Sequence, residues 1–597
     1  MQRHLNSYIS SNLPIALYSS EQVYAIEQAW VDQGYSSFGL MKQAAWQMAH
    51  HITHLYEYKS NGDSKKEGVN TYSQHNKLRR ASVWVGKGNN GGDGWLVALY
   101  LQQLGWQVEV ITVGFDALDL SISTEGQEAV FNDNEEYGSI ADAVKARHRA
   151  LAANCDYRRF ENIEETLDKS NMSAHVYIDA LFGIGLQREP KGVFKRAIEI
   201  FNDLTQRHEA LVIAIDIPSG LVASTGQVFD SVAIKADITL CLVARKLGLH
   251  TKDGHDYSGE IMDVPLIPIE TTDEQCQPSA TLLTGAFGIP ERRQNSYKGS
   301  FGHVLIIGGN QVAGSQGMGG AAILAAASTM AVGAGKITVA CHDAFHSALL
   351  TSLPNAMAIN LHDKDGVKNL IKDTNVVAIG MGLGRDNNAK ILFSTYVIAI
   401  MAQGKSIVID ADGLYHLASL HHENDELVAK LRDYSQSHEV YLTPHSGEAA
   451  RLLSKTVEWI ENNRIEAIKA CAKAYGCDWV LKGAGSLILE QTAAKDKIYV
   501  CGAGNAGMAT AGMGDVLSGV SAGWLAQQDL HETKVSHKPR GLHQAVLIHG
   551  LAGDILIRSS KADDGYNNSL LIGQRGLQAQ DMPNAIRHIV QLITISN

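Results

Sequence analysis

Amide and acidic side chains gather in a glycine-rich stretch near the start of the chain, GKGNNGGDG (residues 86–94). The stretch follows the apolar run 81–85 and precedes a helical pattern of leucines, which predicts a turn between a strand and a helix. Glycine lets the backbone approach a phosphate group closely, and the free N–H groups of a first helical turn point toward such an anion. A turn without a ligand is the alternative, but it would not need Asn89, Asn90 and Asp93 within five residues.

Two further apolar runs end in aspartate. Asp179 ends the run VYID and Asp216 ends the run AID, with Ser219 three residues beyond it. In open α/β sheets ligands bind at the carboxyl ends of the strands, and burying a carboxylate is costly unless it is paired or hydrogen-bonded. Each aspartate taken alone is more often a helix cap or turn residue. Polar residues at three strand ends together indicate a bound cation, a ligand donor or a catalytic base.

A second glycine-rich turn, residues 512–514, precedes Asp515 and an apolar helical stretch. Backbone N–H groups there would form another anion-binding site, and they should keep the Asp515 carboxylate ionised near neutral pH. Such an aspartate can accept a proton or hold a ligand hydroxyl, and a helix N-cap is the alternative. Lys482 stands beside two glycines after an apolar run, which favours a phosphate contact over a surface charge. His445 alone would usually be a core or turn histidine.

The composition describes a globular protein without a surplus of positive charge. The 597 residues include 51 lysines and arginines against 63 aspartates and glutamates, a net charge of −12, so we expect no nucleic-acid partner. Seven scattered cysteines without a CxxC motif or a metal-ligand spacing are typical of a reducing compartment. The N-terminus lacks the apolar core of a signal peptide, and no apolar run is suited to crossing a membrane. We therefore expect a cytoplasmic protein without a membrane partner.

The elements that must position these residues alternate between strand and helix in two blocks. The chain is too long for one ordinary core. From residue 81 to 264, and again after residue 281, apolar strand-like runs alternate with helical stretches, which predicts an α/β fold with mostly parallel sheets and helices on both faces. The stretch 265–280 has three prolines and no clear period. We predict a Rossmann-like domain, 1–264, a linker, 265–280, and a second α/β domain, 281–597.

The motifs of the first block resemble those of the NAD(P)H-hydrate epimerase family. GKGNNGGDG, IDALFGIGLQRE and AIDIPSGL occur in the family's order. The resemblance implies that Asp216 contacts the hydrated ring and acts in catalysis, and that K⁺ is bound by Asn90, Asp179 and Ser219, whose oxygen atoms suit a hard cation. It implies that the hydrated dinucleotide is lined by Asn89, Asn90, Gly91, Gly92, Asp93, Gly183, Ile184, Gly185, Leu186, Gln187, Arg188 and Glu189. The family's early Leu-Met-Glu-x-Ala-Gly motif is altered, because residues 42 and 45 are lysine and alanine.

The second block resembles ribokinase-like proteins, and within them the ADP-dependent NAD(P)H-hydrate dehydratase family. YKGSFGHVLIIGGN, VLKGAGSLILE, LTPHSGEAARLL and AGNAGMATAGMGD carry this resemblance. It implies that the hydrated nicotinamide nucleotide contacts Ala321, Gly384, His445 and the catalytic Asp515. It implies that ADP is bound by Lys482, Gly483, Ala484, Gly485, Ser486 and Gly514, with Mg²⁺ as the companion of the nucleotide. Met513 stands where the family often has threonine, which a backbone role of this loop tolerates.

Both blocks in this order resemble the bifunctional NAD(P)H-hydrate repair enzymes. The resemblance implies a homo-oligomeric enzyme that epimerises the R and S forms of hydrated NADH and NADPH and dehydrates the S form with ADP. Two other functions stay open. The chain could be a small-molecule kinase fused to a sensor domain, and its first domain could bind a nucleotide or a partner without turnover. A kinase would leave a stable phosphorylated substrate, whereas the dehydratase would release NAD(P)H and phosphate.

Overall fold

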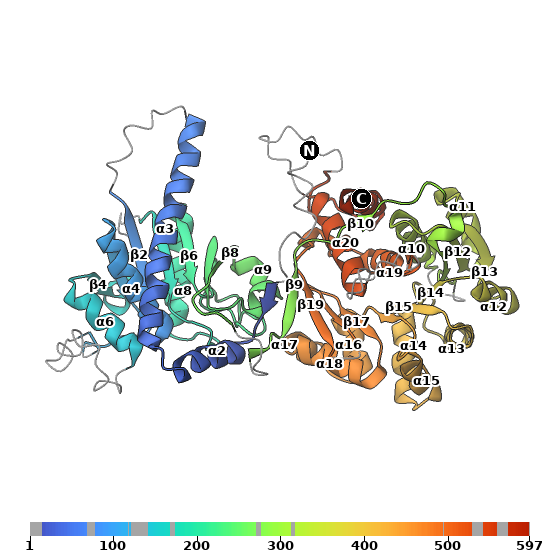
Figure 1. Cartoon of the computed structure of the whole chain (residues 1–597), viewed down its shortest axis with the longest axis horizontal. Coiled ribbons are helices and arrows are strands. Elements are labelled where there is room, and N and C mark those ends of the chain that lie inside the picture. Colours follow the sequence, from blue (N-terminus) through green and yellow to red (C-terminus); the bar gives the residue numbers. More distant parts are fainter. Residues whose placement is uncertain are drawn as a thin grey trace. The chain divides into compact units, whose positions relative to one another are not determined.

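The computed structural model describes residues 15–67, 78–117, 119–120, 141–167, 174–269, 276–311, 317–492, 495–527, 541–557 and 571–595. The chain divides into two compact units (Figure 1). The first unit comprises residues 16–279, and the second comprises the residues from Ala280 onward together with Ile15. Of the stretch 265–280, residues 270–275 lie outside the described part of the chain.

The first unit is built on a seven-stranded sheet in the order β4-β3-β2-β5-β6-β7-β8, in which every neighbouring pair is parallel. Its strands are β2 (Arg80–Val85), β3 (Gln107–Thr112), β4 (Asp156–Arg159), β5 (Val176–Ala180), β6 (Leu211–Ile215), β7 (Ile238–Leu242) and β8 (Glu260–Val264). Its helices are α2 (Ser20–Asp32), α3 (Ser37–Glu67), α4 (Asn89–Gln103), α6 (Asp142–Ala152), α7 (Phe160–Leu167), α8 (Val193–His208), η3 (Leu247–His250) and α9 (Gly254–Tyr257).

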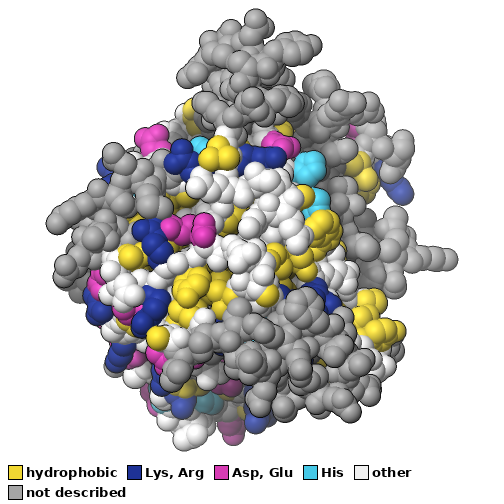
Figure 2. All heavy atoms as spheres, turned by 90° about the vertical axis from the view of Figure 1, so that its left-hand side faces the viewer, with side chains coloured by type: hydrophobic (Ala, Val, Ile, Leu, Met, Phe, Trp, Pro, Cys, Tyr) yellow, Lys and Arg dark blue, Asp and Glu magenta, His cyan; other side chains and the backbone are white. Residues whose placement is uncertain are grey.

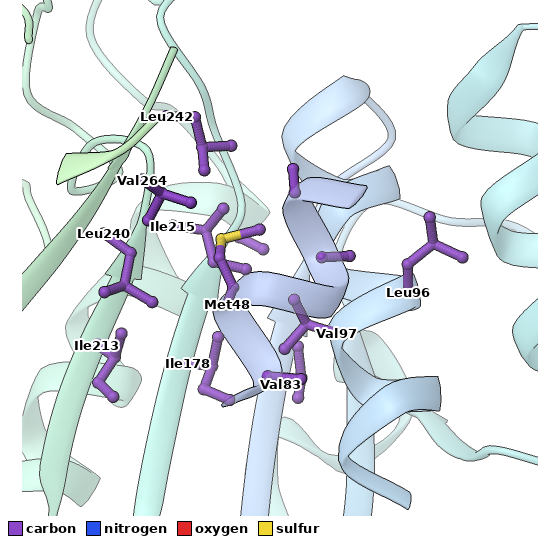
Figure 3. Close-up of a cluster of buried hydrophobic side chains, with 14 of the residues drawn as sticks. Met48, Val83, Leu96, Val97, Ile178, Ile213, Ile215, Leu240, Leu242 and Val264 are labelled. Atoms are coloured by element: carbon purple, nitrogen blue, oxygen red, sulfur yellow. The ribbon is translucent and has the colours of Figure 1, made fainter. Parts of the chain in front are cut away.

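Strand side chains alternate between two cores, one on each face of this sheet. Val83 packs into a core shared with α3 and α4, whereas its neighbour Trp84 packs into a core shared with Phe201 of α8. Figure 3 shows the first core, with Met48 of α3 among sheet residues that include Ile215. Because both faces are covered, the strands read as nearly continuous apolar runs, as the parallel arrangement requires.

The second unit contributes the ten strands from β9 to β13 of an eleven-stranded sheet in the order β1-β9-β19-β18-β17-β16-β15-β14-β11-β12-β13, whose first strand spans the boundary between the units. The pairs β17–β18 and β18–β19 are antiparallel. Along the sheet order from β17 through β16, β15, β14, β11 and β12 to β13, every neighbouring pair is parallel. The strands are β1 (Ile15–Leu17), β9 (Ala280–Leu283), β11 (His303–Ile307), β12 (Lys336–Cys341), β13 (Met357–Asn360), β14 (Val376–Ile379), β15 (Ser406–Ile409), β16 (Val440–Leu442), β17 (Asp478–Leu481), β18 (Leu487–Glu490) and β19 (Lys497–Cys501). A separate parallel pair joins β10 (Ile289–Pro290) to β20 (Thr594–Ile595).

Helices cover the sheet of the second unit, and α19 packs closely against α10. The longer helices are α10 (Gly319–Ala331), α11 (His346–Ser352), α12 (Lys364–Lys372), α13 (Asn387–Ala402), α14 (Asp412–His422), α15 (Glu426–Tyr434), α16 (Ser446–Leu453), α17 (Val457–Asn462), α18 (Arg464–Tyr475), α19 (Met513–Leu525), α20 (Leu542–Ile555) and α21 (Met582–Ile593). A Cβ on Gly519 would overlap the carbonyl of Ala325, so this glycine lets α19 lie directly against α10. The hydroxyl of Thr329 donates to the Gly519 carbonyl at 3.0 Å.

The predicted α/β class, with a parallel first sheet and a second α/β sheet, is confirmed. Figure 2 shows lysine and arginine side chains next to acidic ones on the face it presents, so neither sign of charge dominates the residues coloured there. Among the described residues, no helix is long and apolar enough to cross a membrane.

Candidate active sites

A cavity of about 780 Å³ opens at the carboxyl ends of the strands of the first unit. This volume lies within the range of small-molecule sites. Most of the residues predicted to line the dinucleotide lie here, namely Asn89, Asn90, Asp93, Asp216 and residues 183–188. Gly91, Gly92 and Glu189 are not part of this lining, and the carboxylate of Glu189 pairs with Lys191 at 3.4 Å.

The glycines around the start of α4 serve two different purposes. A Cβ on Gly86 would overlap the carbonyl of Leu181, and one on Gly91 would overlap the carbonyl of Gly86. These two glycines therefore serve the packing of the turn itself. Gly88, the N-cap of α4, has open space where a Cβ would stand and lines the cavity. Backbone N–H groups at this helix start can bind an anionic ligand.

Asn90, Asp179 and Ser219 form one polar cluster around the loop after β5. The Ser219 hydroxyl donates to Oδ1 of Asp179 at 2.6 Å, and the Ser219 N–H donates to Oδ2 at 2.7 Å. Nδ2 of Asn90 donates to the Phe182 carbonyl at 2.7 Å, while its buried Oδ1 has no hydrogen-bond partner in the described part of the chain. Burial raises the pKa of Asp179 to about 6, against the hydrogen bonds from Ser219.

Asp216 lies in an ion pair that the sequence did not indicate. Nζ of the fully buried Lys246 donates to Oδ1 of Asp216 and, at 2.7 Å, to the carbonyl of Leu242. Burial alone would lower the pKa of Lys246, but Asp216 and the other nearby acidic groups raise it. Asp216 also has a positive φ of 67°, a left-handed backbone that places its carboxylate at the strand end.

Three more carboxyl groups line the same cavity, those of Glu27 from α2, Asp93 from α4 and Asp142 from α6. Burial raises the pKa of Glu27 to about 7, the charge of Asp216 raises it further, and Lys246 opposes the shift. Burial, followed by Asp216 and Glu27, raises the pKa of Asp93 well above its usual range. The cavity therefore holds one carboxylate paired with lysine, Asp216, and two carboxyl groups, Glu27 and Asp93, whose pKa is raised above its usual value.

Residues of the altered early motif, 40–45, also line this cavity. Leu40, Met41 and Ala44 of α3 line it. Nζ of Lys42 lies 5.3 Å from the ring centroid of Phe38 on the same helix, a cation–π contact. The substituted lysine is therefore not among the lining residues, and the neighbouring apolar side chains form this wall.

The second unit gathers its charged residues at the carboxyl ends of β15, β16 and β17. Nζ of Lys482 lies 3.0 Å from Oδ1 of the buried Asp410 and 3.8 Å from a carboxylate oxygen of Glu448. The Ser518 hydroxyl of α19 donates to Oδ2 of Asp410 at 2.6 Å. Burial would lower the pKa of Lys482, but Asp410 and Glu448 raise it, while burial raises the pKa of Glu448 to about 7.

Asp515 lies in the first turn of α19 after the N-cap Gly512, whose φ is 90°. The expectation that helix dipoles keep Asp515 ionised is wrong. Burial raises the pKa of Asp515 to about 7, and the charge of Asp410 raises it further against Lys482. Desolvation and a second carboxylate outweigh the N–H dipoles here. A pKa near 7 suits a general base at neutral pH.

The predicted substrate contacts of the second unit share this strand-end region. The Gly384 N–H donates to Oδ2 of Asp412 at 2.9 Å, and the Gly384 carbonyl bonds the buried His416 at 2.8 Å. Ala321, at the start of α10, lies next to the same loop, because a Cβ on Gly382 would stand 3.3 Å from its side chain.

His445 is the N-cap of α16. Its Nδ1 accepts the Gly447 N–H at 2.9 Å, and its own N–H donates to Glu448 at 2.9 Å. Burial and Lys482 lower the pKa of His445, so its acceptor form is favoured. The histidine is thus a cap, and its ring remains exposed at the rim of the site.

Arg464 of α18 contacts the loop from Lys482 to Ser486 through its guanidinium group. The guanidinium donates to the Leu481 carbonyl at 3.0 Å and lies 3.5 Å from the Gly485 carbonyl, one at each end of the loop. It also pairs with Glu461, which accepts the hydroxyl of Ser446. The buried arginine therefore connects the loop after β17 to the loop after β16.

Several charged residues of these sites were not among the predicted ones, including Glu27, Lys246, Asp410 and Arg464. Asp410 follows a strand, as Asp179 and Asp216 do, so the same strand-end rule could have found it. The other three lie on helices or loops, and only the fold brings them to the sites. No cluster of three or more metal-binding side chains is found among the residues that the structure describes.

Comparison with known proteins gives matches for both units. A family model described as NAD(P)H-hydrate dehydratase matches residues 305–572, and one described as YjeF-related protein N-terminus matches residues 37–248. The bifunctional NAD(P)H-hydrate repair enzyme of Coxiella burnetii is 31% identical over 577 residues, which cover 96% of this chain and 99% of that protein. The Escherichia coli enzyme of the same name is 31% identical, over 87% of this chain and 86% of that protein.

Solved structures similar to this chain cover about half of it. A ribokinase-like superfamily protein from Enterococcus faecalis is 26% identical, with 51% of this chain and 93% of that chain covered and a TM-score of 0.40. An ADP/ATP-dependent NAD(P)H-hydrate dehydratase from Bacillus subtilis, co-crystallised with ATP and Mg²⁺, is 24% identical, with 51% and 95% covered and a TM-score of 0.38.

Proposed function

Because the chain belongs to the family of bifunctional NAD(P)H-hydrate repair enzymes, we propose that it returns hydrated NADH and NADPH to the reduced nucleotides. The unit of residues 16–279 interconverts the R and S epimers at C6, and the unit from Ala280 onward dehydrates the S form. The observation that carries this proposal is the presence of two separate strand-end sites in one chain, each built from the motifs of one activity.

Epimerisation is assigned to the cavity of the first unit. The substrate carries a hydroxyl on C6, next to the ring nitrogen, so the C6–O bond can break when the hydroxyl is protonated and the nitrogen lone pair forms a double bond to C6. Water then returns from either face and releases its proton. Asn89 to Asp93 and residues 183–188 would hold the dinucleotide, and the paired carboxylate of Asp216 would face the cationic ring.

A potassium ion fits the cluster beside this cavity. Asn90 supplies a buried Oδ1 without a partner in the described part of the chain, and Asp179 and Ser219 supply further oxygen atoms within hydrogen-bond distance of each other. Oxygen donors of this kind suit a hard monovalent cation. Asn90, Asp179 and Ser219 would hold the ion, and its charge would favour binding of the anionic dinucleotide at the adjacent turn.

Dehydration is assigned to the second unit. A phosphoryl group passes from ADP to the C6 hydroxyl, AMP leaves, and the hydroxyl proton goes to Asp515. Phosphate then departs with the C6–O electron pair as the ring nitrogen forms a double bond to C6, and loss of a proton from C5 restores the dihydronicotinamide ring. Ala321, Gly384 and His445 would position the substrate at this strand-end region.

The adenine nucleotide would lie against the loop from Lys482 to Ser486 and the start of α19. Gly514 lets Nζ of Lys482 approach the start of α19 closely, because a Cβ at this position would stand only 3.1 Å from that atom. Backbone N–H groups and a lysine can stabilise a phosphoryl group in transfer. Mg²⁺ keeps several waters and binds through phosphates, so it fits a site without a dedicated cluster of protein ligands in the described residues.

We also propose a reducing cellular compartment and a homo-oligomer. All seven cysteines lie in the described part of the chain, where they are buried and form no disulfide, which is typical of reducing conditions. Size-exclusion chromatography with light scattering tests the oligomeric state.

The proposed function is tested by product analysis. The protein is incubated with the S epimer of hydrated NADPH, ADP and Mg²⁺, and the products are separated. We expect NADPH, AMP and phosphate in equal amounts. A stable phosphorylated hydrate would instead identify a small-molecule kinase.

A further inference from the structure

One face of α2 contributes three residues to the wall of the first cavity. Tyr24, Glu27 and Val31 follow one another at spacings of three and four, so they lie on the same side of the helix, and all three line the cavity. Glu27 is therefore directed toward the space that the proposed substrate occupies.

Several contacts fix α2 against the substrate loop. The Ser20 hydroxyl donates to the Ile184 carbonyl at 2.9 Å, and the Ser20 N–H donates to the Ser224 hydroxyl at 2.9 Å. Ser19 caps the helix, and Nε2 of Gln22 donates to the Gln277 carbonyl at 2.6 Å. These anchors lie one to two turns before Glu27, so its position in the wall is determined by the fold.

The carboxyl groups of Glu27 and Asp216 face one cavity but have different partners. Asp216 accepts from Lys246 and from the Leu242 N–H at 3.0 Å. In the part of the chain that the structure describes, Glu27 has no hydrogen bond or ion pair. A pair of carboxyl groups in contrasting environments is the arrangement by which enzymes separate an acid from an ionised carboxylate.

We propose that Glu27 is the acid of the epimerisation, which protonates the C6 hydroxyl as it leaves. This inference rests on the proposed function. The Glu27 proton moves to the hydroxyl oxygen, the C–O electron pair leaves with it as water, and the ring nitrogen's lone pair forms the N=C6 bond. Water adds from the opposite face, the double-bond pair returns to nitrogen, and the surplus proton returns to Glu27. The ion-paired carboxylate of Asp216 stabilises the cation between the two steps.

Electrostatics around Glu27 agree with this role. Burial and the charge of Asp216 raise the pKa of Glu27 to about 7, so a large fraction carries a proton at neutral pH. The charged or titratable groups facing it are Tyr24 on its own helix, Asp93 on α4, Asp216 after β6 and Lys246 before η3, with Lys87, Asp142 and Arg188 elsewhere in the cavity wall. Burial also raises the pKa of Asp93, so Asp93 is the alternative acid that the test has to distinguish.

The test compares Glu27→Gln with Glu21→Gln, an exposed glutamate in the first turn of the same helix. Epimerisation of separated R hydrate is followed by chiral chromatography in the full chain, as kcat and KM from pH 5.5 to 9. We expect E27Q to lower kcat by about 10²–10⁴-fold with little change in KM, and E21Q to match the wild type. The wild-type kcat should fall as pH rises through about 7, because the acid form is lost. This decrease of kcat at high pH, the high-pH limb of the profile, should be absent in E27Q and retained in Glu27→Asp.

Dehydration of the S epimer by the same preparations shows that the second unit is folded, and an unchanged KM for the R hydrate together with the activity of Glu27→Asp shows that the first unit is folded. A wild-type chain that cannot epimerise would reject the proposed function itself. A wild-type chain that epimerises, with E27Q active within about threefold, would reject the role of Glu27 alone. Loss of the high-pH limb in Asp93→Asn but not in E27Q would assign the acid to Asp93 and also overturn the inference.

Discussion

Nζ of Lys482 lies 3.0 Å from Oδ1 of Asp410, and Asp410 is almost completely buried. The other oxygen of the same carboxylate accepts the Ser518 hydroxyl from α19. One buried carboxylate therefore ties the loop after β17 to the helix that carries Asp515. The lysine predicted from its sequence context to bind phosphate is already held in place by the protein, because its ammonium group is paired with Asp410.

Lys482→Met should destabilise the second unit, because it leaves the Asp410 carboxylate buried without a cation. Loss of one partner of a buried pair costs about 3 kcal/mol or more. Urea unfolding of the full chain should show a lower midpoint for K482M, with part of the loss recovered when Asp410→Asn is added. Lys469→Met, at an exposed position of α18, is the control. Equal stability of K482M and K469M would contradict the importance of the pair.

Asp515→Asn should abolish most of the dehydration while leaving epimerisation unchanged. The substitution keeps the size of the side chain and removes the proton acceptor, which typically costs about 10²–10⁴-fold in rate. Binding of ADP, measured by calorimetry, should survive, because the loop from Lys482 to Ser486 remains. Lost ADP affinity with turnover otherwise normal would make Asp515 a nucleotide ligand.

The pH profile of dehydration gives the same residue a second test. A general base must be deprotonated, so the wild-type rate should rise as pH increases through about 7 and then level off. The residual activity of D515N should lack this limb. A limb that is unchanged in D515N would belong to another group.

Arg464→Met should weaken the nucleotide loop without touching the reacting atoms. The guanidinium bonds carbonyls at both ends of the loop and pairs with Glu461. Loss of one charged hydrogen bond is worth about 1.5 kcal/mol or more, so we expect the KM for ADP to rise about tenfold with a smaller change in kcat. K469M on the same helix is the matched control, and an unchanged KM for ADP in R464M would contradict the role.

Asp179→Ala should lower epimerisation by about 10–100-fold, with a loss that added potassium does not restore. The reason is that Asp179 is the charged member of the cluster with Asn90 and Ser219. Chiral separation of the hydrates measures the rate, and Asp156→Ala, exposed on β4, is the control. Unchanged epimerisation in D179A would count against the cation site.

Residues at strand ends could be predicted because parallel strands place their carboxyl ends at one edge of a sheet. Asn90, Asp179 and Ser219 come from three strand ends. In the fold Ser219 is hydrogen-bonded to Asp179, and Asn90 is hydrogen-bonded to the loop that follows Asp179. Lys246 could not be predicted as the partner of Asp216, because the pair joins residues thirty positions apart through the fold. Glu27 could not be predicted either, because in the sequence it is only one polar residue of an amphipathic helix.

The wrong prediction for the protonation state of Asp515 has a different cause. The sequence places it at a helix start, where N–H dipoles favour the ionised form. Its burial and the nearness of Asp410 depend on the packing of α19 and on the strand order of the second sheet. Local sequence carries the dipole contribution, whereas desolvation and long-range charge depend on the tertiary structure.

The most direct test of the account is recovery of NADPH from a mixture of its R and S hydrates with ADP and Mg²⁺, followed at the reduced-nicotinamide absorbance band. The wild-type chain should convert the whole mixture, and Asp216→Asn should convert the S fraction and then stall. D515N should recover almost nothing while still interconverting the epimers. Complete recovery by D216N at the wild-type rate, or no recovery by the wild type, would contradict the assignment of the two activities to the two units.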